Sequence, residues 1–527
     1  MTGTHTWRSD LPAVEVGGGT TVPAFALERA AELDEKPALV DGATGRTLGY
    51  RQLAAGVERV AAGLAARGFD KGEVLALASP NLPEYALAAY GAMAAGGVVT
   101  GANPLLTTGE LADQLADAGA RLLVTVPPFA ERALAAAGKA GVEEVLVFGE
   151  ADGATPFREL VAHGHPPVNV AVDPARDLAA LPYSSGTTGL PKGVELTHAS
   201  LVTSARQSQA AMGVREDDVV LAVLPFFHVM GLNLILPCGL RAGASVVTLA
   251  RFDLEGFLET IQERRVTFTI VVPPIALALA NHPLVDRYDL SSLRLVGCGG
   301  APLGADVERR CAERLGCEVV QGFGMSEASA TITISPLEAP RPGSVGRLLP
   351  NTEARIVDPE TGGDLGAGRA GELWVRGPQT MRGYRDRPEA TARTLDAEGW
   401  LRSGDLCHFD EDGYLYVVDR LKELIKDKGH QVAPAELEHL LLAHPAVADA
   451  AVVPRPDPEA GEIPVAHVVL GGEATAAELL SWVAERVAPY KRVRAVQLTD
   501  QIPRAPSGKL LRRVLVEAER ARRGREG

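Results

Sequence analysis

Residues 183–198, YSSGTTGLPKGVELTH, form the stretch from which the rest of the chain is best interpreted. Its hydroxyls, flexible backbone and cation are supplied by Ser184, Ser185, Gly186, Thr187, Thr188 and Lys192. A loop with many donors and one positive charge suits a polyphosphate. It is not a Walker A motif, because Lys192 is followed by Gly193 and Val194 rather than by Ser or Thr. The segment therefore predicts a phosphate-binding loop that differs from that of P-loop NTPases.

Composition narrows the class of protein. The chain has 527 residues, of which 46% are hydrophobic, so it can bury several cores. It carries 52 Lys and Arg against 67 Asp and Glu, a net charge of −15, which disfavours nucleic acid and anionic lipid as partners. Five cysteines without CxxC spacing indicate neither a disulfide framework nor a zinc site, and no signal peptide is evident at the start. We expect a cytoplasmic protein, either a monomer or a homodimer.

The pattern along the chain is typical of an α/β fold. Strand patterns and helical patterns alternate, which favours parallel sheets covered by helices. The expected strands are residues 73–78, 121–126, 219–224, 244–249 and 267–272, and one clear helix is 254–264. Residues 219–240 carry no formal charge, but Pro225 and Pro237 favour a buried strand, loop and helix over a membrane span.

Two changes of pattern divide the rest of the chain. Past about residue 340, short strands such as 371–376 with Gly and Pro turns indicate an antiparallel, barrel-like subdomain that ends near Val418. We predict an N-terminal domain at 1–420 and an α+β C-terminal domain at 421–527. The latter should hold a helix that begins at Pro434, strands at 448–453, 466–470 and 493–498, a helix around 480–487, and a solvated helix from Arg512.

Five further segments make a family resemblance plain. They are QGFGMSE (321–327), GWLRSGDL (399–406), VDRLKELIK (418–426), QVAPAELE (431–438) and PRAPSGKLLRR (503–513). Together with the 183–198 segment they resemble, in order, the acyl-adenylate-forming superfamily, and most of all its coumarate-CoA ligase branch. The resemblance implies a mobile C-terminal domain and a reaction in which a carboxylate attacks the α-phosphate of ATP to form a mixed anhydride with AMP. ATP, Mg²⁺ and, in this branch, CoA would be required.

The resemblance also assigns roles at the nucleotide. Lys509 matches the adenylation lysine, and Glu327 would hold Mg²⁺, which usually takes one or two protein carboxylates. Ser326, where the family usually has Thr, would bind the α-phosphate, and Phe323 would stack on adenine. Asp405 would accept from the ribose hydroxyls with help from Arg420. The remaining nucleotide-binding positions would be Gly299, Gly300, Ala301, Gln321, Gly322 and Gly324.

The acceptor of the activated acid is less strongly specified. Lys422 matches the hinge of the family, and Lys426 and Gln431 match positions used in thioester formation, which favours CoA. Asp427 and His430 replace two aromatic residues of close relatives, and a carboxylate near CoA is unfavourable unless Lys426 and Lys428 screen it. An amine acceptor, or a diazotase reaction with nitrite and an aromatic amine, therefore stays open.

The acid pocket departs from the pattern of the branch. By resemblance it comprises Met230, Leu234, Gly297, Gly300, Gly324, Ala330 and Thr331, with His228 beside it near the passage for the thiol. Met230 stands where coumarate ligases commonly carry Tyr, so the pocket offers space and flexibility rather than a polar anchor. We expect an aromatic or arylpropenoic acid, with a medium-chain fatty acid as the second candidate. A silent nucleotide-binding regulator is the alternative outside enzymes.

Overall fold

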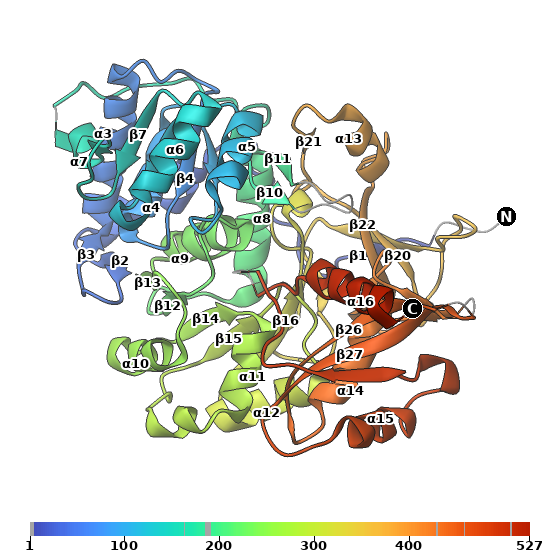
Figure 1. Ribbon diagram of the computed structural model, residues 1–527. Coiled ribbons are helices and arrows are strands. Elements are labelled where there is room, and N and C mark those ends of the chain that lie inside the picture. Colours follow the sequence, from blue (N-terminus) through green and yellow to red (C-terminus); the bar gives the residue numbers. More distant parts are fainter. Residues whose placement is uncertain are drawn as a thin grey trace.

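The computed structural model describes residues 5–162, 164–184, 191–427, 430–457, 459–505 and 508–526. It contains four sheets, two of nine strands and two of five (Figure 1). Ser185, Gly186, Thr187 and Thr188 of the predicted phosphate loop, and Lys428, lie outside the described residues. The mixed α/β architecture with a distinct C-terminal sheet agrees with the predicted fold class.

The first nine-stranded sheet has the order β10-β11-β9-β5-β4-β6-β7-β8, and β21 pairs with β11. Its central strands pair in parallel and read as continuous apolar runs, because helices cover both faces. The strands are β4 (Val74–Ala78), β5 (Val98–Gly101), β6 (Ala120–Thr125), β7 (Glu144–Val147), β8 (Thr155–Pro156), β9 (Leu178–Ala180), β10 (Tyr183–Ser184), β11 (Lys192–Thr197) and β21 (Gly383–Tyr384). The accompanying helices are α3 (Tyr50–Ala66), α4 (Pro83–Ala94), α5 (Thr108–Ala118), α6 (Ala130–Ala140) and α7 (Arg158–Ala162).

The second nine-stranded sheet has the order β18-β17-β16-β15-β14-β12-β13-β2-β3. The strands are β2 (Pro37–Asp41), β3 (Thr47–Gly49), β12 (Val219–Ala222), β13 (Ser245–Thr248), β14 (Phe268–Val271), β15 (Leu295–Cys298), β16 (Glu318–Phe323), β17 (Thr333–Ile334) and β18 (Arg347–Leu348). The helices are α1 (Val22–Ala26), α2 (Ala30–Leu33), α8 (His198–Met212), α9 (Leu236–Ala242), α10 (Leu254–Arg264), α11 (Pro273–Asn281) and α12 (Ala305–Leu315). Helix α8 contacts strands of both large sheets, so it joins them through one core.

The apolar stretch 219–240 is folded inside this region. Strand β12 is followed by a loop, by a π-helical turn (Met230–Ile235) and by α9, as the prolines predicted. Within the described part of the chain, no helix is both long and apolar enough to cross a bilayer. All five cysteines are described, and each is a free thiol.

A five-stranded antiparallel sheet follows, with the order β1-β19-β20-β22-β23. Its strands are β1 (Trp7–Arg8), β19 (Glu353–Val357), β20 (Gly371–Arg376), β22 (Leu401–Phe409) and β23 (Leu415–Arg420), and α13 (Pro388–Thr394) lies between β21 and β22. Gly371, Leu373 and Val375 of β20 are buried while the residues between them are half-exposed. This alternation is typical of a sheet with one face on a core, and the predicted strand 371–376 is confirmed.

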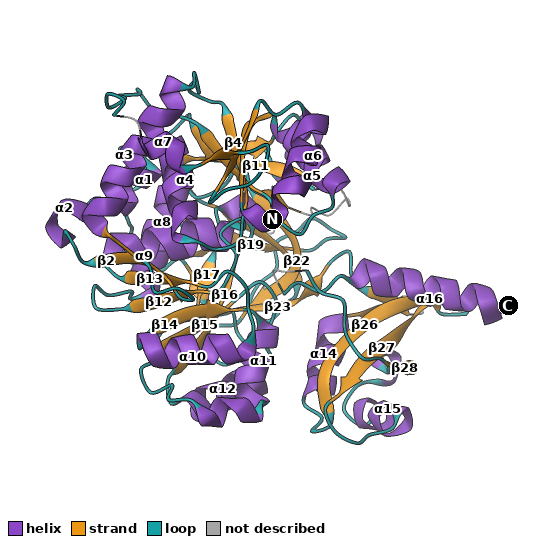
Figure 2. Ribbon diagram, turned by 60° about the vertical axis from the view of Figure 1, so that its left-hand side comes forward, coloured by secondary structure: helices purple, strands orange, loops and turns teal. Residues whose placement is uncertain are grey.

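The C-terminal sheet has its own hydrophobic core, which includes Leu437, Val452 and Val468. Its strands are β24 (Ile425–Asp427), β25 (His430–Val432), β26 (Val447–Asp457), β27 (Gly461–Leu470) and β28 (Ala495–Leu498), and its helices are α14 (Pro434–Leu442), α15 (Ala476–Ala484) and α16 (Arg512–Glu526). Figures 1 and 2 show this unit beside α11 and α12, and residues of α11, α12 and α14 line a shared cavity of ≈ 140 Å³.

The prediction that the tail from Arg512 is a solvated helix was wrong in one respect. Helix α16 exists, but one of its faces packs against β26. Arg512 donates to Glu438 and Glu423, and the fully buried Glu519 accepts from Arg455 at 2.7 Å. The interspersed acidic residue that suggested a solvated surface is therefore an internal partner for an arginine of the sheet.

Candidate active site

The candidate site lies at the carboxyl ends of parallel strands of the second large sheet, where open α/β sheets bind ligands. Strands β15 and β16 pair in parallel through Cys298 and Gln321. The segments that follow them therefore emerge side by side, bringing the predicted residues 299–301 and 322–327 to one edge. Phe323 and Ser326, predicted to contact adenine and α-phosphate, both belong to this edge.

Glu327 is the buried carboxylate at this edge, 5% exposed. Its Oε1 accepts from the Ser184 hydroxyl at 2.8 Å and from the Tyr384 hydroxyl at 2.8 Å. Both of these hydrogen bonds end on Oε1 of Glu327. Within the described chain no group of three or more His, Cys, Asp or Glu side chains gathers. A single buried carboxylate fits Mg²⁺, which completes its coordination with phosphate oxygens and water.

Lys192 places a cation over the ring of Tyr384, whose hydroxyl contacts this carboxylate. Its Nζ lies 4.8 Å from the centroid of the Tyr384 ring. Burial, followed by the charge of Glu327, raises the pKa of Tyr384, so its hydroxyl keeps its proton and donates. The sequence prediction missed Tyr384, because nothing local distinguishes it from the other tyrosines among the nine of the chain.

Gln321 supports the neighbouring loop rather than pointing its side chain at a nucleotide. Its amide accepts from the Leu303 N–H at 2.9 Å and donates to the Leu303 carbonyl at 3.0 Å and to Glu308 at 2.7 Å. These bonds fix the segment that continues from Gly299, Gly300 and Ala301. We therefore expect Gln321 to influence the nucleotide through that segment.

The ribose end is formed by two neighbouring strands. Asp405 of β22 and Arg420 of β23 are direct partners in the antiparallel register, and Nε of Arg420 lies 3.5 Å from Oδ1 of Asp405. Burial raises the pKa of Asp405 to about 6, while the charges of Arg420 and Lys509 act against that rise. The two residues are thus placed together as predicted.

Lys509 reaches the same site from the C-terminal unit. Burial lowers its pKa to about 8, and the charges of Arg420 and Lys422 lower it further while Glu423 and Asp405 oppose them. The preceding Gly508 lies against the large domain, since a Cβ built on it would stand 2.7 Å from Cγ2 of Val272. Burial and then the charge of Lys509 lower the pKa of His228 to about 4, so His228 is neutral near pH 7. The structure therefore brings Lys509, Asp405 and His228 together.

The predicted acid pocket is walled by a strained segment. Ser329 and Ala330 have φ values of 55° and 111°, a conformation that costs energy for residues other than glycine. The Ser329 carbonyl accepts from the Asn233 side chain at 2.7 Å and from the Ser204 hydroxyl at 2.9 Å. Gly324 passes so close that a Cβ on it would stand 1.7 Å from the Ala330 carbonyl oxygen. Asn233 and Ser204 were not predicted from sequence.

The apolar part of the pocket agrees with its predicted character. Leu234, Ala330 and Thr331 are buried, and Met230 is half-buried at the start of the π-helical turn. The Met230 methyl lies 3.3 Å from the place of a Cβ on Gly299, so this flexible side chain separates the pocket from the nucleotide loop. A Cβ on Gly297 would make only ordinary contact with Ile270, at 3.4 Å.

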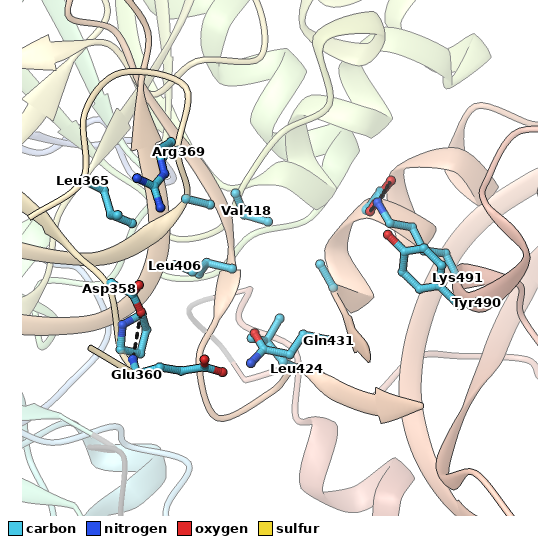
Figure 3. A pocket seen from close by; sticks show the side chains of 14 residues that line it. Asp358, Glu360, Leu365, Arg369, Leu406, Val418, Leu424, Gln431, Tyr490 and Lys491 are labelled. Atoms are coloured by element: carbon cyan, nitrogen blue, oxygen red, sulfur yellow. Dashed lines mark hydrogen bonds and ion pairs between the residues drawn. The ribbon is translucent and has the colours of Figure 1, made fainter. Parts of the chain in front are cut away.

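Lys426 and Gln431 lie elsewhere in this structure. Both are exposed, and Gln431 lines a cavity of ≈ 470 Å³ together with Arg369, Tyr490 and Lys491 (Figure 3). Neither Lys509 nor His228 lines that cavity. Gln431, predicted for the second half-reaction, therefore lies on a different surface from Lys509, and both residues follow Lys422 in the sequence.

The concern about Asp427 is resolved differently from the prediction. Asp427 is 1% exposed, and its carboxylate pairs with Arg494 at 3.1 Å, a partner that the sequence prediction did not name. The His430 ring stacks on Tyr490 with centroids 4.6 Å apart. Asp427 thus makes a buried ion pair and His430 an exposed ring contact, each with a partner far along the chain.

Comparison with known proteins gives a consistent result. Residues 27–385 match the model of the AMP-binding enzyme family, and residues 436–509 match that of the AMP-binding enzyme C-terminal domain. The chain is 43% identical to a 4-coumarate–CoA ligase of Pinus taeda, over 97% of each protein.

Two solved structures are also similar to the chain. The anthranilate CoA ligase AuaEII in complex with anthranoyl-AMP has a TM-score of 0.89 at 27% identity, covering 98% of this chain and 99% of the other. The amide bond synthetase McbA of Marinactinospora thermotolerans has a TM-score of 0.84 at 30% identity, covering 94% and 99% respectively.

The shifted pKa values of Asp405 and Lys509 predict a bell-shaped pH dependence of kcat/KM for ATP. This parameter reports the free protein, in which Asp405 is protonated below a pH of about 6 and Lys509 loses its proton above about 8. Activity should therefore rise through the first value and fall through the second. In Lys509→Arg, whatever activity remains should show no fall at the second value, since Arg stays protonated. An unchanged alkaline limb in Lys509→Arg would contradict the assignment.

Proposed function

The chain belongs to the AMP-binding enzyme family, in its coumarate-CoA ligase-like branch, and on that basis we propose that it activates an aromatic carboxylic acid for transfer to CoA. The acid is activated with ATP as an acyl-adenylate, and the products are the acyl-CoA thioester, AMP and pyrophosphate. The observation that carries the proposal is the position of Lys509, seated from another domain beside Asp405, Arg420 and His228.

The first half-reaction joins two anions. An oxygen of the substrate carboxylate attacks the α-phosphorus of ATP, the bond to the β-phosphate oxygen breaks, and pyrophosphate leaves. The Lys509 ammonium stabilises the charge that moves between carboxylate and phosphate. Lys192 and Ser326 hold the phosphates, Phe323 the adenine, and Asp405 with Arg420 the ribose. Glu327 would hold Mg²⁺, which supplies further positive charge to the phosphate oxygens.

The second half-reaction transfers the acyl group. The sulfur of CoA attacks the acyl carbonyl, a C–S bond forms, and AMP leaves. Because Lys426 and Gln431 lie on a surface away from Lys509, the unit that we assign to residues 421–527 must turn about Lys422 relative to residues 1–420 before they reach the adenylate. His228, neutral near pH 7, borders the pocket; we propose that it contacts the carboxylate or the thiol. The free thiols of the chain suit a cytoplasmic location, which we also propose.

A second candidate acceptor is an amine. It is favoured by the similarity to an amide bond synthetase, in which the same scaffold serves amide formation. An amine attacking the acyl carbonyl would give an amide and AMP, with loss of a proton. Adenylation of nitrite followed by capture by an arylamine is the remaining variant. The burial of Asp427 against Arg494 removes the sequence argument against CoA, so CoA is the preferred acceptor.

The separation of the two surfaces predicts variants that lose one half-reaction each. Lys509→Ala should slow adenylation by about 10²–10³, the usual cost of removing a preorganised charge-stabilising group, yet still convert added acyl-AMP and CoA to thioester. Gln431→Ala should adenylate normally and form thioester slowly. Pyrophosphate release and thioester absorbance measure the two steps. Lys139→Ala, on the exposed face of α6, is the control. If Lys509→Ala and Gln431→Ala each lost both adenylation and thioester formation, the assignment of the two half-reactions to separate surfaces would be wrong.

The apolar pocket predicts the choice of acid. Cinnamic acid should be activated at least as well as coumaric acid, because Met230 offers the phenol no hydrogen bond, and octanoic acid should be slower. AMP release measured with each acid, with and without CoA, an amine, or nitrite plus an arylamine, identifies both substrates. Exclusive use of octanoate would exclude the aromatic proposal, and CoA-independent consumption of nitrite would exclude CoA. A chain that releases no pyrophosphate with any acid would be a silent regulator.

A further inference from the structure

We propose that Tyr384 is a positioning residue that joins the two halves of the nucleotide site, orienting Glu327 for Mg²⁺ through its hydroxyl and Lys192 for phosphate through its ring. The inference rests on the proposed function and deepens it, because it concerns the same nucleotide. Neither Glu327 nor Lys192 belongs to the strand of Tyr384, so both contacts are tertiary.

The hydroxyl of Tyr384 fixes one oxygen of the carboxylate. It donates to Oε1 of Glu327 at 2.8 Å, and the Ser184 hydroxyl donates to the same atom at 2.8 Å. Glu327 is 5% exposed and Tyr384 6% exposed, so water competes little for these bonds. Two donors on one oxygen set the rotation of the carboxylate and direct Oε2 away from them. Without the tyrosine hydroxyl, Ser184 is the one of these two donors that remains.

The ring of Tyr384 fixes the cation. Nζ of Lys192 stands 4.8 Å from the ring centroid, within the range of a cation–π interaction. Lys192 is the first residue of β11 and the cation of the predicted phosphate-binding segment 183–198. The ring therefore holds an ammonium group where the phosphate chain is expected, independently of the hydroxyl at its other end.

The backbone around Tyr384 is fixed on several sides. In the β21–β11 pair, Tyr384 lies opposite Val194, and its N–H donates to Oγ1 of Thr391 at 2.9 Å. The Met381 N–H donates to the main-chain carbonyl of Glu327 at 2.8 Å. A segment that comes after the antiparallel strand β20 thus returns to clamp the phosphate strand and the Glu327 turn together. A rigid mount of this kind is what a positioning residue requires.

Two variants separate the two contacts. Tyr384→Phe keeps the ring and removes the hydrogen bond to Glu327, whereas Tyr384→Leu removes both. Binding of a fluorescent ATP analogue, measured with and without Mg²⁺, reports them without any turnover. In Tyr384→Phe, affinity with Mg²⁺ should fall about tenfold, as expected for a lost hydrogen bond to a charged group, and metal-free affinity should stay unchanged. In Tyr384→Leu, metal-free affinity should fall as well, by a few-fold.

Tyr414→Phe is the matched control. Tyr414 is also buried, donates its hydroxyl to the Ala339 carbonyl at 2.7 Å, and carries the guanidinium of Arg341 4.1 Å from its ring centroid. The Tyr414→Phe variant therefore loses one buried tyrosine hydrogen bond and keeps a ring beside a cation, as Tyr384→Phe does, but outside the candidate site. Its nucleotide affinity should equal that of the wild type with and without Mg²⁺. Thermal unfolding of all variants shows whether any loss of binding follows from loss of fold.

The outcomes distinguish this inference from the proposed function. If Tyr384→Phe binds the analogue with Mg²⁺ as tightly as Tyr414→Phe does, the inference is wrong, even when the wild type forms acyl-adenylate. If the wild type forms no adenylate but Tyr384→Phe loses Mg²⁺-dependent binding, the proposed function is wrong and the positioning role stands. Equal losses in Tyr384→Phe with and without Mg²⁺ would contradict the link to the carboxylate.

Discussion

The candidate site depends on a cluster of positive charges, those of Lys509, Arg420 and Lys422. Burial and then the charge of Arg420 lower the pKa of Lys509 and of Lys422, while the charges of Glu423 and Asp405 oppose that shift. Placing like charges in a poorly solvated site costs free energy that a polyanion can offset. A bound nucleoside triphosphate is such a polyanion, so the same electrostatic strain that weakens the empty site strengthens its complex. The affinity for ATP and the closure of the C-terminal unit are thereby linked.

Residues of the candidate site come from all four sheet-containing units of the protein. The first large sheet supplies Lys192, the second supplies the Glu327 turn, the antiparallel sheet supplies Asp405 and Arg420, and the C-terminal unit supplies Lys509. The fold thus assembles one site from four sheets. The short strand β21, which lies in sequence between β20 and β22 of the antiparallel sheet, pairs with β11 and so connects that sheet to the first large sheet.

Local patterns predicted much of this arrangement, and tertiary neighbours account for the rest. The helix 254–264 and the strand 371–376 have the predicted bounds, since periodicity alone decides such elements. Motifs located Glu327, Asp405 and Lys509, which the structure brings to one site. Sequence reasoning failed where a partner comes from far along the chain: Tyr384 on Glu327, Arg455 on Glu519, and Arg494 on Asp427. No spacing rule encodes those pairs.

The glycine at position 508 gives the docked state a mechanical character. Its backbone rests on Val272 with no clearance for even a single added carbon. A methyl group there would clash with Val272 and keep Lys509 from reaching the candidate site, although no reactive group would be removed. In the proposed rotation of the C-terminal unit, a methyl group at this position would therefore disfavour the docked arrangement. Substitution of Gly508 is therefore the change through which the docked arrangement could be disfavoured.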